Sequence, residues 1–293
     1  MRINVLGSIE IISDGRVRSP GGPGQRALLA TLALDHGRVV AVDRLTRILW
    51  ADRPPATART KIQAHVSALR QIMGHSPGDA DSPLLTVPPG YLLADQTVDL
   101  DLAEFSGLMS EGLAAAEAGE PAAASELLGR ALALWRGTAF TGVSAIPILA
   151  AAEGLDARRL MAADVKAEAD LELGRYATVV TELSALLIAH PLRERSRGLA
   201  MLALDRLGCR ADALGLYRSG EQALRCELGI EPGGWLRGVH ERILTGDPGI
   251  GAGTDDPRPR PFRRMMHGPG AGGAPTMTEW SNRCTGRGAS CYP

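Results

Sequence analysis

The chain has 293 residues, of which 45% are apolar, and its 32 Lys and Arg nearly balance its 33 Asp and Glu, giving a formal net charge of −1. This length and apolar content predict about two folded domains and exclude a chain that is disordered throughout. No apolar run reaches the roughly 18 residues of a membrane span, no apolar secretory signal opens the chain, and four cysteines do not suggest a disulfide scaffold. We therefore expect a soluble cytoplasmic protein without a membrane partner.

The charge is distributed unevenly along the chain. Residues 1–95 carry a net charge of +3, residues 96–247 carry −7, and residues 248–293 carry +3. No acidic residue occurs between Arg53 and Gly78. A predicted helix with charges of one sign is typical of a phosphate-facing surface, although a solvated helix face gives the same pattern.

Residues 1–95 predict a small α+β unit with two hairpins and three helices. Alternating β-branched residues around Asp14-Gly15 predict the first hairpin. Apolar spacing then predicts three successive helices, and Pro88-Pro89-Gly90 predicts the turn of a second hairpin. The expected strands are Ile3–Leu6, Ile9–Ile12, Arg16-Val17, Leu84–Val87 and Tyr91–Leu93, and the expected helices are Gln25–Asp35, about Asp43–Trp50 and about Ala56–Met73. This order is that of a winged helix-turn-helix.

The third predicted helix has two contrasting faces. Its apolar residues recur at helical spacing and predict a buried stripe of Ile62, Val66, Leu69 and Met73. Hydrogen-bonding side chains occupy the opposite face, namely Thr60, Gln63, Ser67 and Gln71, with Arg59 and Arg70 on one side and Lys61 on the other. Because Arg can bind guanine or phosphate and Gln can pair with adenine, this face is suited to the major groove of DNA.

Four motifs in this region resemble the Streptomyces antibiotic regulatory protein (SARP) family in order and spacing. They are Gly22–Leu29, Val42–Leu45 with Leu49-Trp50, Pro54–Arg59 with Val66–Arg70, and Pro88–Leu93. The resemblance implies a winged helix of the response-regulator type whose third helix enters the major groove. It also implies DNA contact by the residues Arg59, Thr60, Lys61, Gln63, Ser67 and Arg70.

Two positions depart from the family pattern. Gly24 stands where the family often has a lysine before its Gln-Arg pair, so the resemblance does not support a phosphate contact from that loop. The predicted wing, residues 76–94, has no basic residue, so a wing contact would have to use backbone N–H groups or Tyr91. For Tyr91 the alternative, which we favour, is packing against the domain core.

Residues 98–246 predict a helical repeat domain. Gly119, Gly174 and Gly208 are each followed at the same offsets by small and large apolar residues, and the last two glycines lie 34 residues apart, the tetratricopeptide period. The segments 131–137, 190–194 and 227–233 resemble landmarks of the SARP family's bacterial transcriptional activation domain, which implies dimer formation and contact with RNA polymerase. We expect Trp135, Tyr217 and Trp235 to pack in the core.

The remaining residues, 247–293, are rich in Gly and Pro and predict a disordered tail. Cys284 and Cys291 lack further ligands at zinc-site spacing, so no metal is expected. The chain has no phosphate-binding loop, nucleophile elbow or metalloprotease motif, and its histidines are scattered. We expect no enzymatic activity, no catalytic residue and no cofactor.

The sequence thus predicts a mainly α protein with a small α+β part, comprising a winged helix-turn-helix at 1–95, a tetratricopeptide-like activation domain at 98–246, and the tail. The resemblance implies a transcriptional activator of a secondary-metabolite (antibiotic) gene cluster. Such a protein would bind direct repeats near promoters as a homodimer, recruit RNA polymerase and associate with the nucleoid. The alternatives are a helical-repeat adaptor without specific DNA binding, and a repressor on the same fold.

Overall fold

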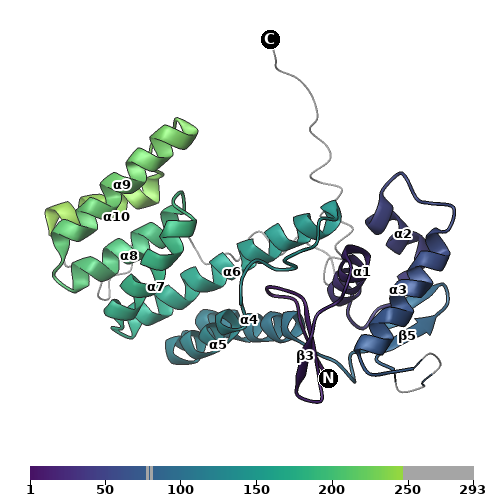
Figure 1. Ribbon diagram of the computed structural model, residues 1–293. Coiled ribbons are helices and arrows are strands. Elements are labelled where there is room, and N and C mark those ends of the chain that lie inside the picture. The colour runs from purple at the N-terminus through teal and green to yellow at the C-terminus, as the bar shows by residue number, and fades with distance from the viewer. Residues whose placement is uncertain (77–78, 80–81, 247–293) are drawn as a thin grey trace, which may run out of the picture. The chain divides into compact units, whose positions relative to one another are not determined.

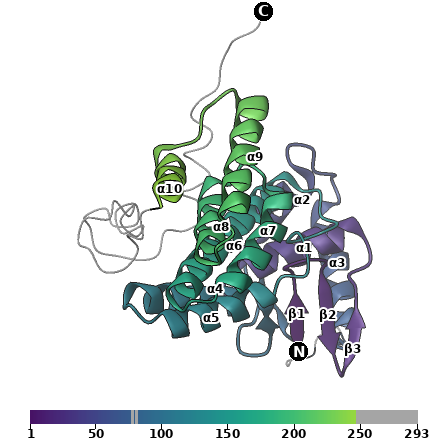
Figure 2. The ribbon, with the colours of Figure 1, turned by 90° about the vertical axis from the view of Figure 1, so that its left-hand side faces the viewer.

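The computed structural model describes residues 1–76, 79 and 82–246 (Figure 1). The chain begins with a sheet whose strand order is β3-β2-β1-β7. The first three strands form an antiparallel meander, visible side by side in Figure 2, whose bounds are Arg2–Asn4 (β1), Glu10–Ser13 (β2) and Arg16–Arg18 (β3). The predicted Asp14-Gly15 turn is confirmed, since both residues have positive φ as a tight hairpin requires. The fourth strand, β7 (Asp99–Leu100), pairs in parallel with β1.

Three helices and a second sheet complete the winged helix. The helices are α1 (Pro23–Leu34), α2 (Val42–Trp50) and α3 (Ala58–Ile72), and the sheet has the order β4-β6-β5, with β4 at Val40–Ala41, β5 at Leu84–Val87 and β6 at Gly90–Leu93. Helix α3 begins two residues later than the spacing predicts, because the chain after Pro55 first makes a turn in which the Ala58 N–H donates to the Pro55 carbonyl. The winged helix-turn-helix is confirmed.

Helical hairpins follow, each with a glycine at its turn. Gly119, Gly174 and Gly208 all have left-handed φ values, between +72° and +77°, which glycine adopts without steric cost. They separate the helix pairs α4 (Asp101–Glu117) and α5 (Pro121–Ala133), α6 (Ile146–Glu172) and α7 (Tyr176–Ala189), and α8 (Glu194–Arg206) and α9 (Arg210–Leu228). A further helix, α10 (Gly234–Thr245), packs on α8 and α9. The predicted repeat is therefore confirmed.

The repeat positions lie in the core. The residues five positions after the turn glycines, Ala124, Val179 and Ala213, are all 0% exposed. Trp135 and Tyr217 are buried as expected, and Trp235 is partly buried between two apolar clusters. Small side chains at these points let neighbouring helices approach closely.

One apolar core joins the winged helix to the first helices of the repeat domain. It contains Ile3, Leu28 and Leu69 from the N-terminal part together with Phe105 and Trp135 from the helical part. The whole of Met1–Asp247 is one structural unit. The predicted boundary between residues 95 and 98 therefore lies within one continuous apolar core. The predicted tail from 247 onward lies outside the described residues.

Candidate nucleic-acid interface

Helix α3 presents the polar face that the sequence predicts. Its apolar stripe is fully packed, with Ile62 and Leu69 at 0% exposure and Val66 at 2%. On the opposite face Arg59, Thr60, Lys61 and Gln63 are exposed, and Ser67 and Arg70 are partly exposed. Because the buried stripe fixes the rotation of the helix, these six side chains lie outside its packed face.

Two cations on this surface are free of carboxylates. Among the described residues, neither the Arg59 guanidinium nor the Lys61 ammonium has an ion-pair or hydrogen-bond partner. Both occupy the first turns of α3, which has no acidic residue in its first turn. The unpaired guanidinium and ammonium groups can donate hydrogen bonds to phosphate oxygens. The neighbouring Thr60 and Gln63 side chains can both donate to and accept from the edges of bases.

Arg70 holds a position that the sequence did not reveal. Its Nε donates to the Leu84 carbonyl at 2.9 Å, and its Nη2 donates to the Thr86 hydroxyl at 2.9 Å, so it ties the recognition helix to strand β5 of the wing. Arg18 similarly donates to the Ile72 carbonyl at 2.7 Å, where α3 ends. The expected DNA contact of Arg70 stays a prediction, and the structure shows its side chain hydrogen-bonded to strand β5.

The wing is held close to the helices by a glycine. A Cβ at Gly90 would lie 1.8 Å from the Val40 carbonyl oxygen, so the pairing of β6 with β4 requires glycine there. Tyr91 is 7% exposed and belongs to the core, which confirms the packing alternative. The described residues of the wing thus expose backbone groups and the Thr86 side chain and carry no basic side chain.

The structure gives a physical reason for the glycine at position 24. A Cβ at Gly24 would lie 2.5 Å from Nε2 of His65 on α3, so a lysine there would displace the imidazole. Burial, assisted by the nearby Lys61 ammonium, lowers the pKa of His65 below its ordinary value. His65 fills the space beside Gly24 in the first turn of α1.

Elsewhere the buried charges are structural. Asp170, 1% exposed, accepts hydrogen bonds from Lys166 and Arg175 and from the Ser125 hydroxyl at 2.7 to 3.2 Å. Hydrogen bonds from Lys166 and Ser125 outweigh the effect of burial and lower the pKa of Asp170. Among the described residues, no three His, Cys, Asp or Glu side chains gather as metal ligands would. No helix in the described ranges is long and apolar enough to cross a membrane.

Comparisons with known proteins agree with this geometry. Residues 19–93 match the family model "Transcriptional regulatory protein, C terminal", and residues 100–244 match "Bacterial transcriptional activator domain". The chain is 37% identical over 256 residues to the regulatory protein DnrI of Streptomyces peucetius, covering 85% of this chain and 94% of DnrI. The chain belongs to the SARP family of transcriptional regulators. It therefore combines a winged-helix DNA-binding part with an activator domain.

This SARP also resembles longer regulators. It is 38% identical over 251 residues to AfsR of Streptomyces coelicolor, and the aligned region covers 85% of this chain but only 25% of AfsR. Its fold is similar to a solved structure of Mycobacterium tuberculosis EmbR in complex with a low-affinity phosphopeptide, with a TM-score of 0.76, 37% identity, and coverage of 84% of this chain and 65% of that one. The SARP chain thus spans about a quarter of AfsR and about two thirds of EmbR.

Proposed function

We propose that this SARP activates a secondary-metabolite gene cluster by binding direct repeats near promoters and recruiting RNA polymerase. The observation that supports the proposal most strongly is the carboxylate-free polar face of α3, on which Arg59 and Lys61 flank Thr60 and Gln63. In this proposal the protein binds as a homodimer in the cytoplasm, where it associates with the nucleoid. The activator domain supplies the polymerase contact.

The proposed contacts divide into two kinds. Gln63 and Thr60 read base edges in the major groove, while Lys61 and Arg59 hold phosphates or a guanine edge. Ser67 and Arg70, further along α3, contact the flanking backbone. The net charge of −7 on residues 96–247 favours approach with the winged helix toward DNA, because the acidic part is repelled by phosphate.

Binding of the full chain to promoter fragments from neighbouring genes tests the proposal. Fluorescence anisotropy would compare wild type, Gln63→Ala and Lys61→Ala on promoter and random DNA at several salt concentrations. Loss of a base contact by Gln63→Ala is expected to cost about 1–3 kcal/mol on promoter DNA only, whereas Lys61→Ala weakens all binding and reduces the salt slope by about 1. Arg130→Ala, which removes an exposed arginine from α5, serves as the matched control.

Each result decides between the proposal and an alternative. If wild type binds promoter and random DNA alike, the adaptor interpretation replaces DNA reading. If Gln63→Ala and Arg130→Ala bind promoter DNA equally well, α3 is not the reading element. A promoter–reporter assay then separates activation from repression, since the same fold supports either outcome.

A further inference from the structure

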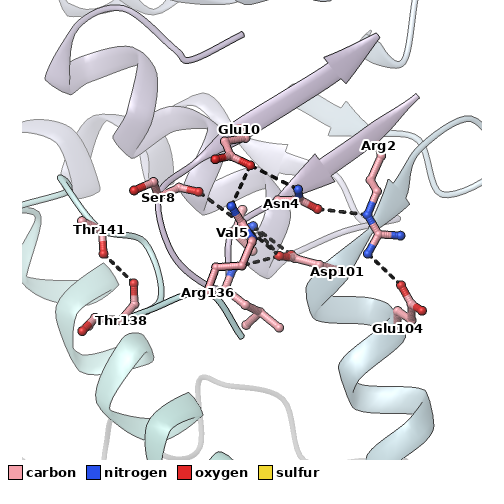
Figure 3. Close-up of polar contacts among 11 residues, drawn as sticks. Arg2, Asn4, Val5, Ser8, Glu10, Asp101, Glu104, Arg136, Thr138 and Thr141 are labelled. Carbon is pink, nitrogen blue, oxygen red and sulfur yellow. Dashed lines mark hydrogen bonds and ion pairs between the residues drawn. The ribbon is translucent and has the colours of Figure 1, made fainter. Parts of the chain in front are cut away.

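The segment Val5–Gly7, which follows strand β1 of the winged helix, takes its hydrogen-bonding partners from the helical part of the chain. The Val5 N–H donates to both carboxylate oxygens of Asp101, at 2.8 and 2.9 Å, and the Leu6 N–H donates to one of them at 3.0 Å (Figure 3). Asp101 is the first residue of α4 and is 1% exposed. A single carboxylate of the helical part therefore satisfies two consecutive, fully buried N–H groups of the DNA-binding part.

The carbonyl groups of the same segment are satisfied from the loop between α5 and α6. The Val5 carbonyl accepts from the Phe140 N–H at 2.8 Å, and the Leu6 carbonyl accepts from the Arg136 N–H at 2.8 Å. Gly7, with a φ of +152°, lets the two backbones meet, since a Cβ there would lie 3.1 Å from Cβ of Arg136. The segment is thus bonded to α4 through its N–H groups and to this loop through its carbonyl groups.

The Arg136 side chain closes the arrangement over the segment. Its guanidinium pairs with Glu10 of β2 at 2.7 Å, donates to the Ser8 carbonyl at 3.3 Å, and lies 3.5 Å from Asp101 (Figure 3). Burial raises the pKa of Asp101, and the hydrogen bonds from Leu6 and Val5 and the charge of Arg136 oppose that rise. The buried carboxylate is thus balanced by donors from both parts of the chain.

No flexible linker separates the two parts. Only residues 94–98 connect β6 to β7, and both ends are fixed, because the Ala94 N–H donates to the Pro83 carbonyl at 2.8 Å and the Asp99 N–H to the Met1 carbonyl at 2.9 Å. Arg26 of α1 adds a second connection, donating to the Gly142 carbonyl at 3.1 Å. These hydrogen bonds thus join the winged helix to the repeat helices in addition to the apolar core that the two parts share.

We propose that Asp101 and Arg136 are positioning residues that fix the angle between the recognition helix and the helical domain, so that two copies bind adjacent repeats only at one helical phase. This inference rests on the proposed function, since it assumes binding to direct repeats. If the winged helix and the helical domain were flexibly connected, a dimer could bind two DNA repeats at many different spacings. A rigid connection would not allow this, because adding half of the 10–10.5 bp helical turn moves the second site to the opposite side of the duplex.

The test measures binding of the full chain to four DNA fragments. One carries a single repeat, and the other three carry two repeats whose spacing is natural, longer by half a helical turn, or longer by a full turn. For wild type, a half-turn insertion should weaken binding to the pair about tenfold, and a full-turn insertion should largely restore it. Asp101→Asn places amide hydrogens against the Val5 or Leu6 N–H. We expect it to bind one repeat within about twofold of wild type and to reduce the half-turn penalty to about twofold.

Two further variants separate positioning from folding. Glu104→Gln, one turn along α4, removes an exposed carboxylate that pairs with Arg2 and should keep the wild-type phase dependence. Arg136→Gln leaves the Asp101 bonds to Val5 and Leu6 in place and should weaken phase dependence less than Asp101→Asn. The proposal is overturned if Asp101→Asn keeps the full half-turn penalty, or if it loses single-repeat binding as strongly as pair binding.

A DNA-independent measurement separates failure of this inference from failure of the proposed function. Spin labels at Gln71→Cys on α3 and Gln222→Cys on α9, in a chain whose native cysteines are replaced by serine, report the distance between the two parts. We expect one narrow distance distribution for the wild-type background and Glu104→Gln, and at least a doubling of its width for Asp101→Asn. If the Asp101→Asn and wild-type distance distributions have equal widths, the inference is overturned even when specific DNA binding is established. If the Asp101→Asn distribution is broadened but wild type binds promoter and random DNA alike, only the proposed function is overturned.

Discussion

Substitution of Gly198 by alanine probes how tightly the last three helices pack. Gly198 lies within α8, and a Cβ there would come 2.3 Å from Cζ3 and 2.5 Å from Cη2 of Trp235 on α10. The indole has little room to retreat, because the Arg195 guanidinium lies over it at 4.7 Å from the ring centroid and apolar clusters on both sides contact it. The added methyl must therefore move α10 or rotate Trp235.

Two opposing effects set the magnitude. Alanine is favoured over glycine inside a helix by about 1 kcal/mol, whereas overpacking a filled site costs about 1–3 kcal/mol and occasionally more. Since 2.3 Å is far inside van der Waals contact, the upper end of the overpacking range applies, and Gly198→Ala should lower the free energy of unfolding by about 2 kcal/mol. In a unit of this size, that corresponds to a fall in Tm of about 4–8 °C.

Urea unfolding followed by circular dichroism measures this change, and α9 offers a matched control. A Cβ at Gly215, also inside a helix, meets nothing within 4 Å, so Gly215→Ala should raise stability by about 1 kcal/mol. A double variant, Gly198→Ala with Trp235→Leu, should be less destabilised than the two single changes predict. The reasoning is refuted if Gly198→Ala and Gly215→Ala stabilise the protein equally, or if the Trp235 change has no coupling to Gly198→Ala.

Two further predictions concern a buried charge and the wing. Because the folded-state pKa of Asp170 lies below its ordinary value of 3.8, its stabilising contribution is present above that pH and is lost as the pH falls through the folded pKa. The stability difference between wild type and Asp170→Asn, measured by urea unfolding, should therefore shrink steadily below about pH 4. Gly90→Ala should separate β6 from the Val40 carbonyl, lower stability by about 3 kcal/mol and weaken promoter binding in anisotropy, whereas equal stability would mean the clash is relieved elsewhere.

Local patterns in the sequence predicted most of the fold. The spacing of Ile62, Val66 and Leu69 identified the buried face of α3, because a helix with one apolar stripe has only one stable rotation against a core. The turn glycines of the repeat, such as Gly119 and Gly174, were recognisable because the left-handed backbone conformation excludes most other residues. The polar face of α3 followed from these same periodicities.

Contacts between distant residues were not predictable in the same way. Arg70 looked like a DNA-facing cation, and only the folded chain brings it to the Leu84 carbonyl and Thr86. Asp101 is an ordinary helix-starting residue by sequence, and its bonds reach backbone groups more than 90 residues earlier. No single-sequence pattern encodes such pairings, since every residue except proline can supply a backbone N–H.

The long separation in sequence between Val5 and its hydrogen-bonding partners also affects the order in which parts of the chain can fold. The groups that satisfy the segment after β1 are Asp101, Arg136, Phe140 and Thr141, so the ribosome has made nearly half of the 293-residue chain before this segment can complete its hydrogen bonds. Closing such long loops is slow relative to forming adjacent helices. The helices α1 to α3 can therefore form early, while the β1 segment docks only after the loop preceding α6 has emerged.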